Sequence, residues 1–133
     1  MTIPLIFSED VTRARADGAH IVALDSTTIT HCLPLPRNLA VAIQAEDAVR
    51  AAGAVPATIA VRDGAIRVGL SATELENLAN ADGVWKLSRA DIAAALVLRA
   101  TGATTVAATM IAARLAGISV FATGGIGGMH RGA

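Results

Sequence analysis

The chain has 133 residues, a length suited to one domain with a buried core and too short for two. Basic and acidic residues both total 11 and aromatic residues make up only 2%, which excludes the positive field and the stacking surface typical of nucleic-acid-binding proteins. No apolar run approaches the roughly 20 residues of a membrane span, and Glu9 and Asp10 stand where a signal peptide would be apolar. The composition therefore predicts a cytoplasmic protein without nucleic-acid or membrane partners.

The sequence pattern of the N-terminal part predicts a helix, a buried strand and a second helix. A polar, alanine-rich stretch over residues 12–19 predicts a short helix. The strand predicted over residues 20–28 begins with a continuous apolar run, which is typical of a strand buried on both faces. Prolines then interrupt regular structure, and Asn38 is expected to cap a helix over residues 39–52.

The middle of the chain predicts a hairpin followed by a capped helix. Two β-branched runs within residues 55–70 flank Asp63 and Gly64, a pair that strongly favours a tight hairpin turn. Ser71 and Glu74 have the S-x-x-E spacing of a capping box, so we expect the next helix to begin there.

The last third predicts two more helices and two more strands. Ser88 and Asp91 form a second capping box before a helix predicted to reach about residue 100. The remaining expected elements are a short strand at residues 104–106, a helix over 107–115 closed by Gly117, and a last strand over 118–125.

This alternation of strands and helices predicts an α/β protein. We expect a three-layer α/β/α sandwich with a largely parallel or mixed sheet, in which residues 1–133 form one domain or a piece of one. Ligands of such sheets bind beyond the carboxyl ends of the strands. Asp25 and the glycine-rich end of the chain both follow predicted strands, so both are candidates for a binding site.

The glycine-rich block FATGGIGGMHRGA ends the chain at residues 121–133. The dinucleotide fingerprint G-x-G-x-x-G fails because His130 stands where the third glycine belongs, and a Walker A loop is excluded because no Gly-Lys-Ser/Thr follows. Two interpretations stay open. The block is either a backbone-amide nest for phosphate, aided by His130 and Arg131, or a structural turn with a solvated basic tip.

Three further residues are candidates for chemistry. Asp25 directly follows the buried strand and is suited to general acid or base catalysis if burial raises its pKa; the other interpretation is a turn aspartate bonded to its own backbone. His31 is more typical of a hydrogen-bonded structural residue. Lys86 is the only lysine among 11 basic residues and is expected in a loop, where its point charge suits a phosphate or carbonyl.

Taken in order, six blocks of this sequence resemble the pseudouridine-5′-phosphate glycosidase family, also called indigoidine synthase A-like proteins. They are VALDST (22–27), GAVPATIAVRDG (53–64), VGLS (68–71), KLSRAD (86–91), GATTVAATM (102–110) and VFATGGIGGMHRGA (120–133). The resemblance implies a hydrolase or lyase of pseudouridine degradation that reversibly splits pseudouridine 5′-phosphate into uracil and ribose 5-phosphate. It also implies a divalent metal, typically Mn²⁺, a lysine that attacks ribose C1′, and a homo-oligomer, namely a trimer.

The resemblance also implies roles for individual residues. Asp25 stands at the family's acid position, which handles the proton on the uracil side. Lys86 and Val106 stand at substrate-contacting positions, and His130 stands near the ribose phosphate. Thr123 and the glycines after it fit the wall of the same pocket.

Two departures from the family pattern predict that this chain is inactive by itself. Asp25 is one methylene shorter than the family's glutamate, and proton transfer requires placement within hydrogen-bond reach. The family's metal-binding aspartate and nucleophilic lysine lie downstream of the glycine-rich block, so no metal ligand is expected within these residues. The chain is then either part of a longer enzyme, or a non-catalytic sugar-phosphate-binding remnant or short homologue that oligomerises to cover an exposed face.

Overall fold

The computed structural model describes residues 2–127 and 131–132. Its elements in chain order are β1 (Leu5–Phe7), α1 (Glu9–Asp17), β2 (Ile21–Leu24), a π-helical turn (Thr28–Cys32), α2 (Arg37–Ala51), β3 (Val55–Arg62), β4 (Ala65–Val68), α3 (Ala72–Asn80), β5 (Trp85–Leu87), a 3₁₀ turn (Arg89–Asp91), α4 (Ile92–Val97), β6 (Gly102–Thr104), α5 (Val106–Ala116) and β7 (Val120–Ala122). None of the helices among the described residues is long and apolar enough to span a membrane.

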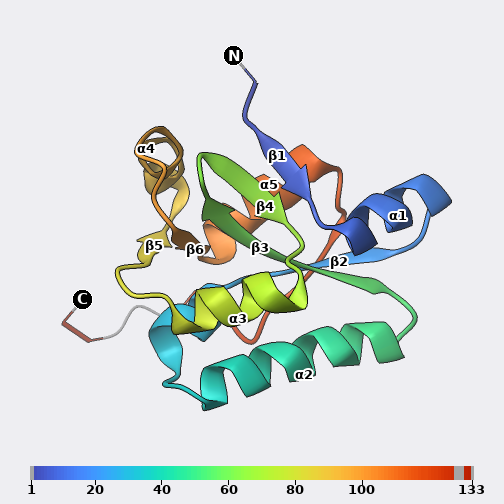
Figure 1. Ribbon diagram of the computed structural model, residues 1–133, viewed down its shortest axis with the longest axis horizontal. Helices are drawn as coiled ribbons and strands as arrows, with labels where there is room; N and C mark the ends of the chain where they lie inside the picture. Colours follow the sequence, from blue (N-terminus) through green and yellow to red (C-terminus); the bar gives the residue numbers. More distant parts are fainter. Residues whose placement is uncertain (1, 128–130, 133) are drawn as a thin grey trace.

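The seven strands form one sheet centred on β3, the longest strand (Figure 1). One edge of β3 pairs with β4, and β1 continues the sheet beyond β4. The other edge of β3 is shared by β2 and β6, which carry β7 and β5 on their outer sides. Four of the six strand pairings are parallel, so the predicted largely parallel or mixed sheet is confirmed.

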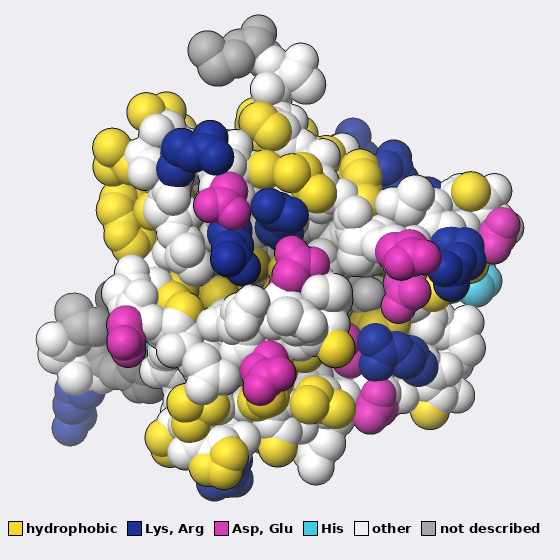
Figure 2. All heavy atoms as spheres, in the orientation of Figure 1, with side chains coloured by type: hydrophobic (Ala, Val, Ile, Leu, Met, Phe, Trp, Pro, Cys, Tyr) yellow, Lys and Arg dark blue, Asp and Glu magenta, His cyan; other side chains and the backbone are white. Residues whose placement is uncertain are grey.

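Helices cover both faces of this sheet (Figure 1). Side chains alternate between the faces along β3: Ile59 and Val61 pack with α1, α4 and α5, whereas Ala60 packs with α2 and α3. Each face thus has its own apolar core, and the predicted α/β/α arrangement of layers is confirmed. In Figure 2, acidic and basic side chains alternate over the visible surface without a continuous patch of one sign, consistent with equal totals of 11.

The most unusual feature of the sheet is that β2 and β6 run toward each other along the same edge of β3. Leu24 pairs with Thr58 in a parallel sense, and Ala103 pairs with Ala60 in an antiparallel sense, so the carboxyl ends of both strands converge beside Ile59. A parallel and an antiparallel partner therefore share one edge of β3.

Buried hydroxyl groups join these two strand ends. Ser26 Oγ and Thr104 Oγ1 donate hydrogen bonds of 2.6 and 2.9 Å to the carbonyl oxygen of Ile59. Ser26 Oγ also accepts the Thr104 N–H at 2.8 Å, and the Ser26 N–H donates to the Thr104 carbonyl at 3.2 Å. Ser26 and Thr104 are 0% and 1% exposed, so water cannot replace these partners.

Several local predictions are confirmed. The hairpin turns at Asp63 and Gly64, whose φ angles of 53° and 76° are the positive values of a tight hairpin turn. Ser71 and Glu74 form both hydrogen bonds of a capping box at the start of α3. Gly117 ends α5 in the left-handed conformation, with φ of 74°.

Other local predictions are wrong, because tertiary contacts override the local signal. Asn38 does not cap α2 but lies within it, where its side-chain amide donates 3.0 Å hydrogen bonds to the buried carbonyls of Ile29 and Ala79. Lys86 lies in strand β5 and not in a loop. This strand has only 3 residues, and it forms because it pairs with β6, which is distant in the sequence.

Boundaries also differ from the predicted ones. The strand predicted over residues 20–28 ends at Leu24 and gives way to a π-helical turn, and α4 is confined to Ile92–Val97 because the Ser88–Asp91 box closes a 3₁₀ turn first. The strand predicted at 104–106 is shifted to Gly102–Thr104, since Thr105 caps α5.

Removing the Ser26 hydroxyl tests the junction between β2 and β6. We expect Ser26→Ala to lower the free energy of unfolding by about 1–3 kcal/mol, because it leaves the buried Thr104 N–H without its acceptor. Urea denaturation followed by circular dichroism measures the change. The exposed Ser119 provides a control, and Ser119→Ala should change the free energy by less than about 0.5 kcal/mol. Equal stability of the two variants would contradict the role given to Ser26.

Candidate functional site

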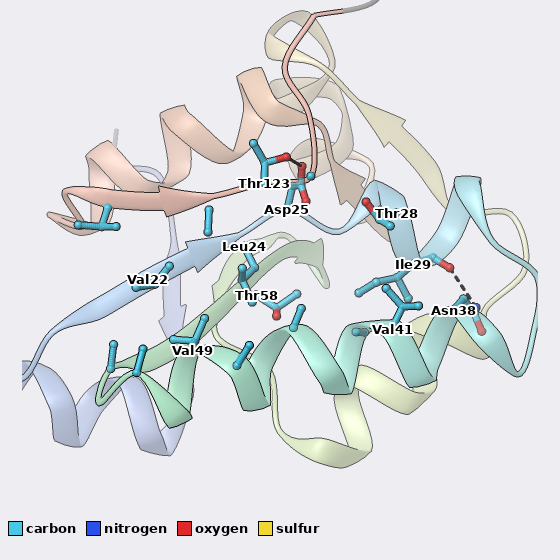
Figure 3. Close-up of a pocket in the computed structure, with 18 residues that line it drawn as sticks. Val22, Leu24, Asp25, Thr28, Ile29, Asn38, Val41, Val49, Thr58 and Thr123 are labelled. Atoms are coloured by element: carbon cyan, nitrogen blue, oxygen red, sulfur yellow. Dashed lines mark hydrogen bonds between the residues drawn. The ribbon is translucent and has the colours of Figure 1, made fainter.

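Asp25 and Thr123 lie side by side at the carboxyl ends of neighbouring parallel strands. β2 and β7 pair in the register Leu24 to Ala122, so the next residue of each strand leaves the sheet at the same point. The Thr123 hydroxyl donates a 2.8 Å hydrogen bond to Asp25 Oδ2, although the two residues are 98 positions apart in the sequence (Figure 3). The expectation that Asp25 and the glycine-rich block both follow the carboxyl ends of strands is thus confirmed, and the structure adds that the two are in contact.

Burial raises the pKa of the Asp25 carboxyl above its ordinary value, because desolvation disfavours the charged form. The hydrogen bond from Thr123 and one from the backbone of Asp25 lower the pKa and offset part of this effect. The condition stated from the sequence, that burial should raise the pKa of this carboxyl, is met. A half-buried carboxyl with a raised pKa at a strand end is suited to hold and transfer a proton.

Thr123 also shapes the start of the glycine-rich block. The Gly125 N–H approaches Thr123 Oγ1 at 3.5 Å, so the hydroxyl oxygen anchors the first turn after β7. Gly127 has φ of 82°, a left-handed conformation that favours glycine over residues with a side chain. His130 lies outside the described residues, and the phosphate nest suggested by the sequence stays a prediction.

Lys86 and Val106 lie on the β6 side of the junction, on strand β5 and at the start of α5. Lys86 lies on β5 opposite Ala103 of β6, and Val106 is the first residue of α5, directly after the Thr105 cap. Since Leu87 is buried in the core with α4 and α5, Lys86 faces the opposite side of the sheet, toward α2 and α3. No hydrogen bond or ion pair between described residues joins Lys86 to Asp25; the two are linked through the junction of β2 with β6.

His31 has a structural role, as its sequence context favoured. Its Nε2 lies 3.0 Å from the carbonyl oxygen of Val84, and its Nδ1 contacts the Thr30 hydroxyl. Both ring nitrogens are therefore engaged within the protein.

An apolar groove of about 570 Å³ runs between α2 and the strands β2 and β7, and Asp25 and Thr123 line its side midway along, between Leu24 and Thr28 (Figure 3). Its floor is formed by aliphatic side chains of β2 and β7, and its wall by the alanines and valines of α2. Thr58, which also lines it, donates a 2.7 Å hydrogen bond to the buried Glu46. The titratable carboxyl thus lies beside an apolar groove, as is typical of ligand sites that combine apolar walls with a few polar groups.

The described residues do not form a metal site. Within residues 2–127 and 131–132 no group of three or more histidine, cysteine, aspartate or glutamate side chains is arranged to hold a metal ion. These residues do not fit the Mn²⁺ implied by the resemblance, so we derive no chemical step through a metal.

The residues that sequence reasoning missed are Ser26 and Thr104. Both lie inside blocks that we singled out, VALDST and GATTVAATM, yet each had a plain interpretation as a strand or cap residue. A polar residue directly after an apolar run was the available signal, but nothing local indicated that the two hydroxyls share one acceptor.

Replacing Thr123 tests how the protein controls the Asp25 carboxyl. We expect Thr123→Val to raise the pKa of Asp25 further, because the variant loses a hydrogen bond that stabilises the carboxylate. A carbon-detected NMR titration of the carboxyl group measures this value. Thr12→Val, on the exposed side of α1, is the matched control and should leave the titration of Asp25 unchanged. Identical titrations in the two variants would refute the hydrogen bond.

Comparisons with known proteins identify the family of this chain. The family model described as indigoidine synthase A like protein matches residues 10–133. The pseudouridine-5′-phosphate glycosidase of Jannaschia sp. (strain CCS1) is 66% identical over 133 residues, which are 100% of this chain and 44% of that protein. The chain therefore spans less than half the length of this curated relative.

Two crystal structures share the fold. The prealnumycin C-glycosynthase AlnA, solved in complex with ribulose 5-phosphate, is 42% identical with a TM-score of 0.83, covering 98% of this chain and 42% of that one. An indigoidine synthase A-like protein from Thermotoga maritima is 29% identical with a TM-score of 0.84 and the same coverage of 98% and 42%. Sequence family and fold agree, and the chain belongs to the indigoidine synthase A-like family, of which it represents the N-terminal portion.

Proposed function

We propose that this chain is the N-terminal portion of an enzyme that reversibly cleaves the C–C glycosidic bond of pseudouridine 5′-phosphate into uracil and ribose 5-phosphate. The observation that carries this proposal is the half-buried Asp25 carboxyl, with its raised pKa and its hydrogen bond from Thr123, at the carboxyl ends of two parallel strands. Relatives named pseudouridine-5′-phosphate glycosidase at up to 66% identity support the choice of substrate.

In this reaction Asp25 acts on the uracil side. When the bond between ribose C1′ and uracil breaks, the electron pair stays on the uracil carbon, which then takes up a proton. Asp25 supplies that proton during cleavage and removes it during synthesis, and its raised pKa favours the protonated form that donates. Thr123 holds Oδ2 and so fixes the orientation of the carboxyl group.

The other substrate contacts follow from the family positions. Lys86 and Val106 contact the substrate, and His130 lies near the ribose phosphate. The convergence of β5, β6, β2 and β7 supports a shared site for Lys86, Val106, Asp25 and Thr123, because their strands end around one junction. The cytoplasmic location and the homotrimer stay predictions.

Covalent catalysis requires more than these residues supply. The family's nucleophile is a lysine placed against C1′, and the sole lysine, Lys86, already stands at a substrate-contacting position. The Mn²⁺ ligand of the family also stands downstream of the glycine-rich block. We therefore infer that residues 1–133 provide the acid and part of the pocket but do not complete the reaction.

The isolated chain tests this inference directly. Incubated with pseudouridine 5′-phosphate and Mn²⁺, the purified 133-residue chain should release no more uracil than a protein-free control, because the nucleophilic lysine is missing. Chromatographic detection of uracil measures the reaction, with the full-length Jannaschia relative as the positive control. Uracil release by the isolated chain above background would overturn the inference.

A second candidate function is sugar-phosphate binding without catalysis. The ribulose 5-phosphate in the complex of the 42% identical prealnumycin C-glycosynthase supports this candidate, because a pocket for a five-carbon sugar phosphate occurs in that fold. In this chain the ligand would contact Thr123 and the glycine-rich block.

Thermal stability in the presence of ribose 5-phosphate tests whether the chain binds a sugar phosphate. If the chain holds a sugar phosphate, millimolar ribose 5-phosphate should raise its melting temperature, since a ligand that binds only the folded state stabilises it. Differential scanning fluorimetry measures the shift, and Thr123→Val should reduce it while Thr12→Val should not. Inorganic phosphate distinguishes a general anion effect from recognition of the sugar. An unchanged melting temperature with ribose 5-phosphate would exclude this function.

A further inference from the structure

Strand β7 is a free edge of the sheet. Among the described residues it pairs only with β2, and Val120 on this strand is 55% exposed. Its unpaired main-chain groups form a template to which another strand can add.

Neither face of β7 is fully covered, although Phe121 packs against the core on one of them. On one face lies the apolar groove of about 570 Å³ beneath α2, which Val120 and Ala122 line. On the other face lies a second hollow of about 490 Å³, between β7, the end of α1 and the end of α5, lined by Ile118 and again by Val120. A strand inside a three-layer sandwich is normally covered by helices on both faces, so both helix layers are incomplete at this end of the sheet.

The wall of the groove is built to contact an apolar partner. Ala45, Ala48 and Ala52 of α2 are exposed and line the groove, whereas the charged residues of this part of the helix are engaged elsewhere. Glu46 and Asp47 both bind Arg50, at 3.0 and 2.9 Å. Among the described residues, Asp25 is the only ionisable one that lines the groove. Exposed apolar surface of this extent next to an open strand edge marks an interface.

The length of the relatives indicates what covers this surface. The chain represents the N-terminal portion of its family and matches 44% of the Jannaschia protein and 42% of the two crystallised chains. More than half of each relative therefore lies outside the matched part, and β7 is the last strand of the matched part. A polypeptide that continues the sheet beyond β7 meets the free edge and both hollows at once.

We propose that the β7 edge and the α2 groove form a docking surface for the C-terminal portion of this family, and that the chain binds this portion when it is supplied as a separate polypeptide. One strand of the partner extends the sheet at β7 through main-chain hydrogen bonds, and an apolar segment of the partner fills the groove beside Asp25. Docking on β7 also positions Thr123 and the glycine-rich block, which directly follow this strand.

This inference rests on family membership and on the exposed surface, and it does not depend on the proposed reaction. Its readout is binding, so a failure to cleave pseudouridine 5′-phosphate leaves it intact, and a failure to bind leaves the proposed chemistry of Asp25 to be judged separately.

Co-production of two polypeptides tests the proposal. The 133-residue chain is produced together with the part of the Jannaschia protein that lies outside its matched region, and the mass of the purified assembly is measured by light scattering. We expect an assembly with equal numbers of both polypeptides. Hydrogen exchange should show greater protection of β7 (Val120–Ala122) in the assembly than in the isolated chain, where only the edge that faces β2 is paired.

Matched variants locate the interface. Ala45→Glu combined with Ala48→Glu puts two charges into the apolar groove and should weaken binding at least about tenfold. Ala40→Glu is the control, because Ala40 is exposed on the same helix and does not line the groove. Equal weakening by the two variants, or a stable assembly of the 133-residue chain with itself that excludes the second polypeptide, would overturn the proposal.

A covalent chimera decides the case in which the separate C-terminal portion is insoluble. The 133-residue chain is fused to that portion in a Cys32→Ser background, which removes the one exposed thiol. In Ala48→Cys the thiol should react with maleimide quickly in the isolated chain and slowly in the chimera, whereas in Ala40→Cys it should react quickly in both. A thiol at position 48 that reacts equally fast in the chimera and the isolated chain would refute the docking surface.

Discussion

The structure depends on one convergence: β2 and β6 approach head-on along the same edge of β3 and are joined at the carbonyl of Ile59. The hydroxyls of Ser26 and Thr104 supply the donors there, and their burial makes each hydrogen bond costly to lose. Without this junction β3 would have a gap where its parallel partner ends and its antiparallel partner begins. Because the two hydroxyls close this gap, the carboxyl ends of β2, β5, β6 and β7 lie around one junction.

The candidate site follows directly from the convergence. Asp25 immediately precedes Ser26, so the residue that joins the strands also fixes the backbone that carries the carboxyl group. Because the pKa of Asp25 is raised in the folded chain, the protonated form is favoured on folding, and the group becomes a source of instability as pH rises through its folded pKa. The stability difference is absent below the unfolded pKa, so acid relieves it. A carboxyl group whose burial lowers the stability of the folded protein is typical of a functional position.

Strand β7 connects the candidate chemistry with the exposed surface. Its last residues lead into Thr123, which donates to Asp25, while its outer edge is unpaired among the described residues and a hollow lies on each of its faces. A partner that adds to this edge would therefore act on the same short segment that orients the acid. Completion of the sheet and completion of the site are coupled through 3 residues of β7 in this arrangement.

The sequence by itself determined the features that depend on neighbouring residues: the hairpin at Asp63 and Gly64, the capping box at Ser71, the alternation of strands and helices, and the family resemblance of its blocks. Tertiary structure alone decided that Asn38 binds two distant carbonyls inside α2, that Lys86 belongs to a strand, and that Ser26 and Thr104 share one acceptor. The physical reason is the distance along the sequence between the residues that interact. Turn and cap signals arise from hydrogen bonds between residues a few positions apart, whereas a 3-residue strand or a buried hydroxyl pair acquires its partner only when the sheet assembles.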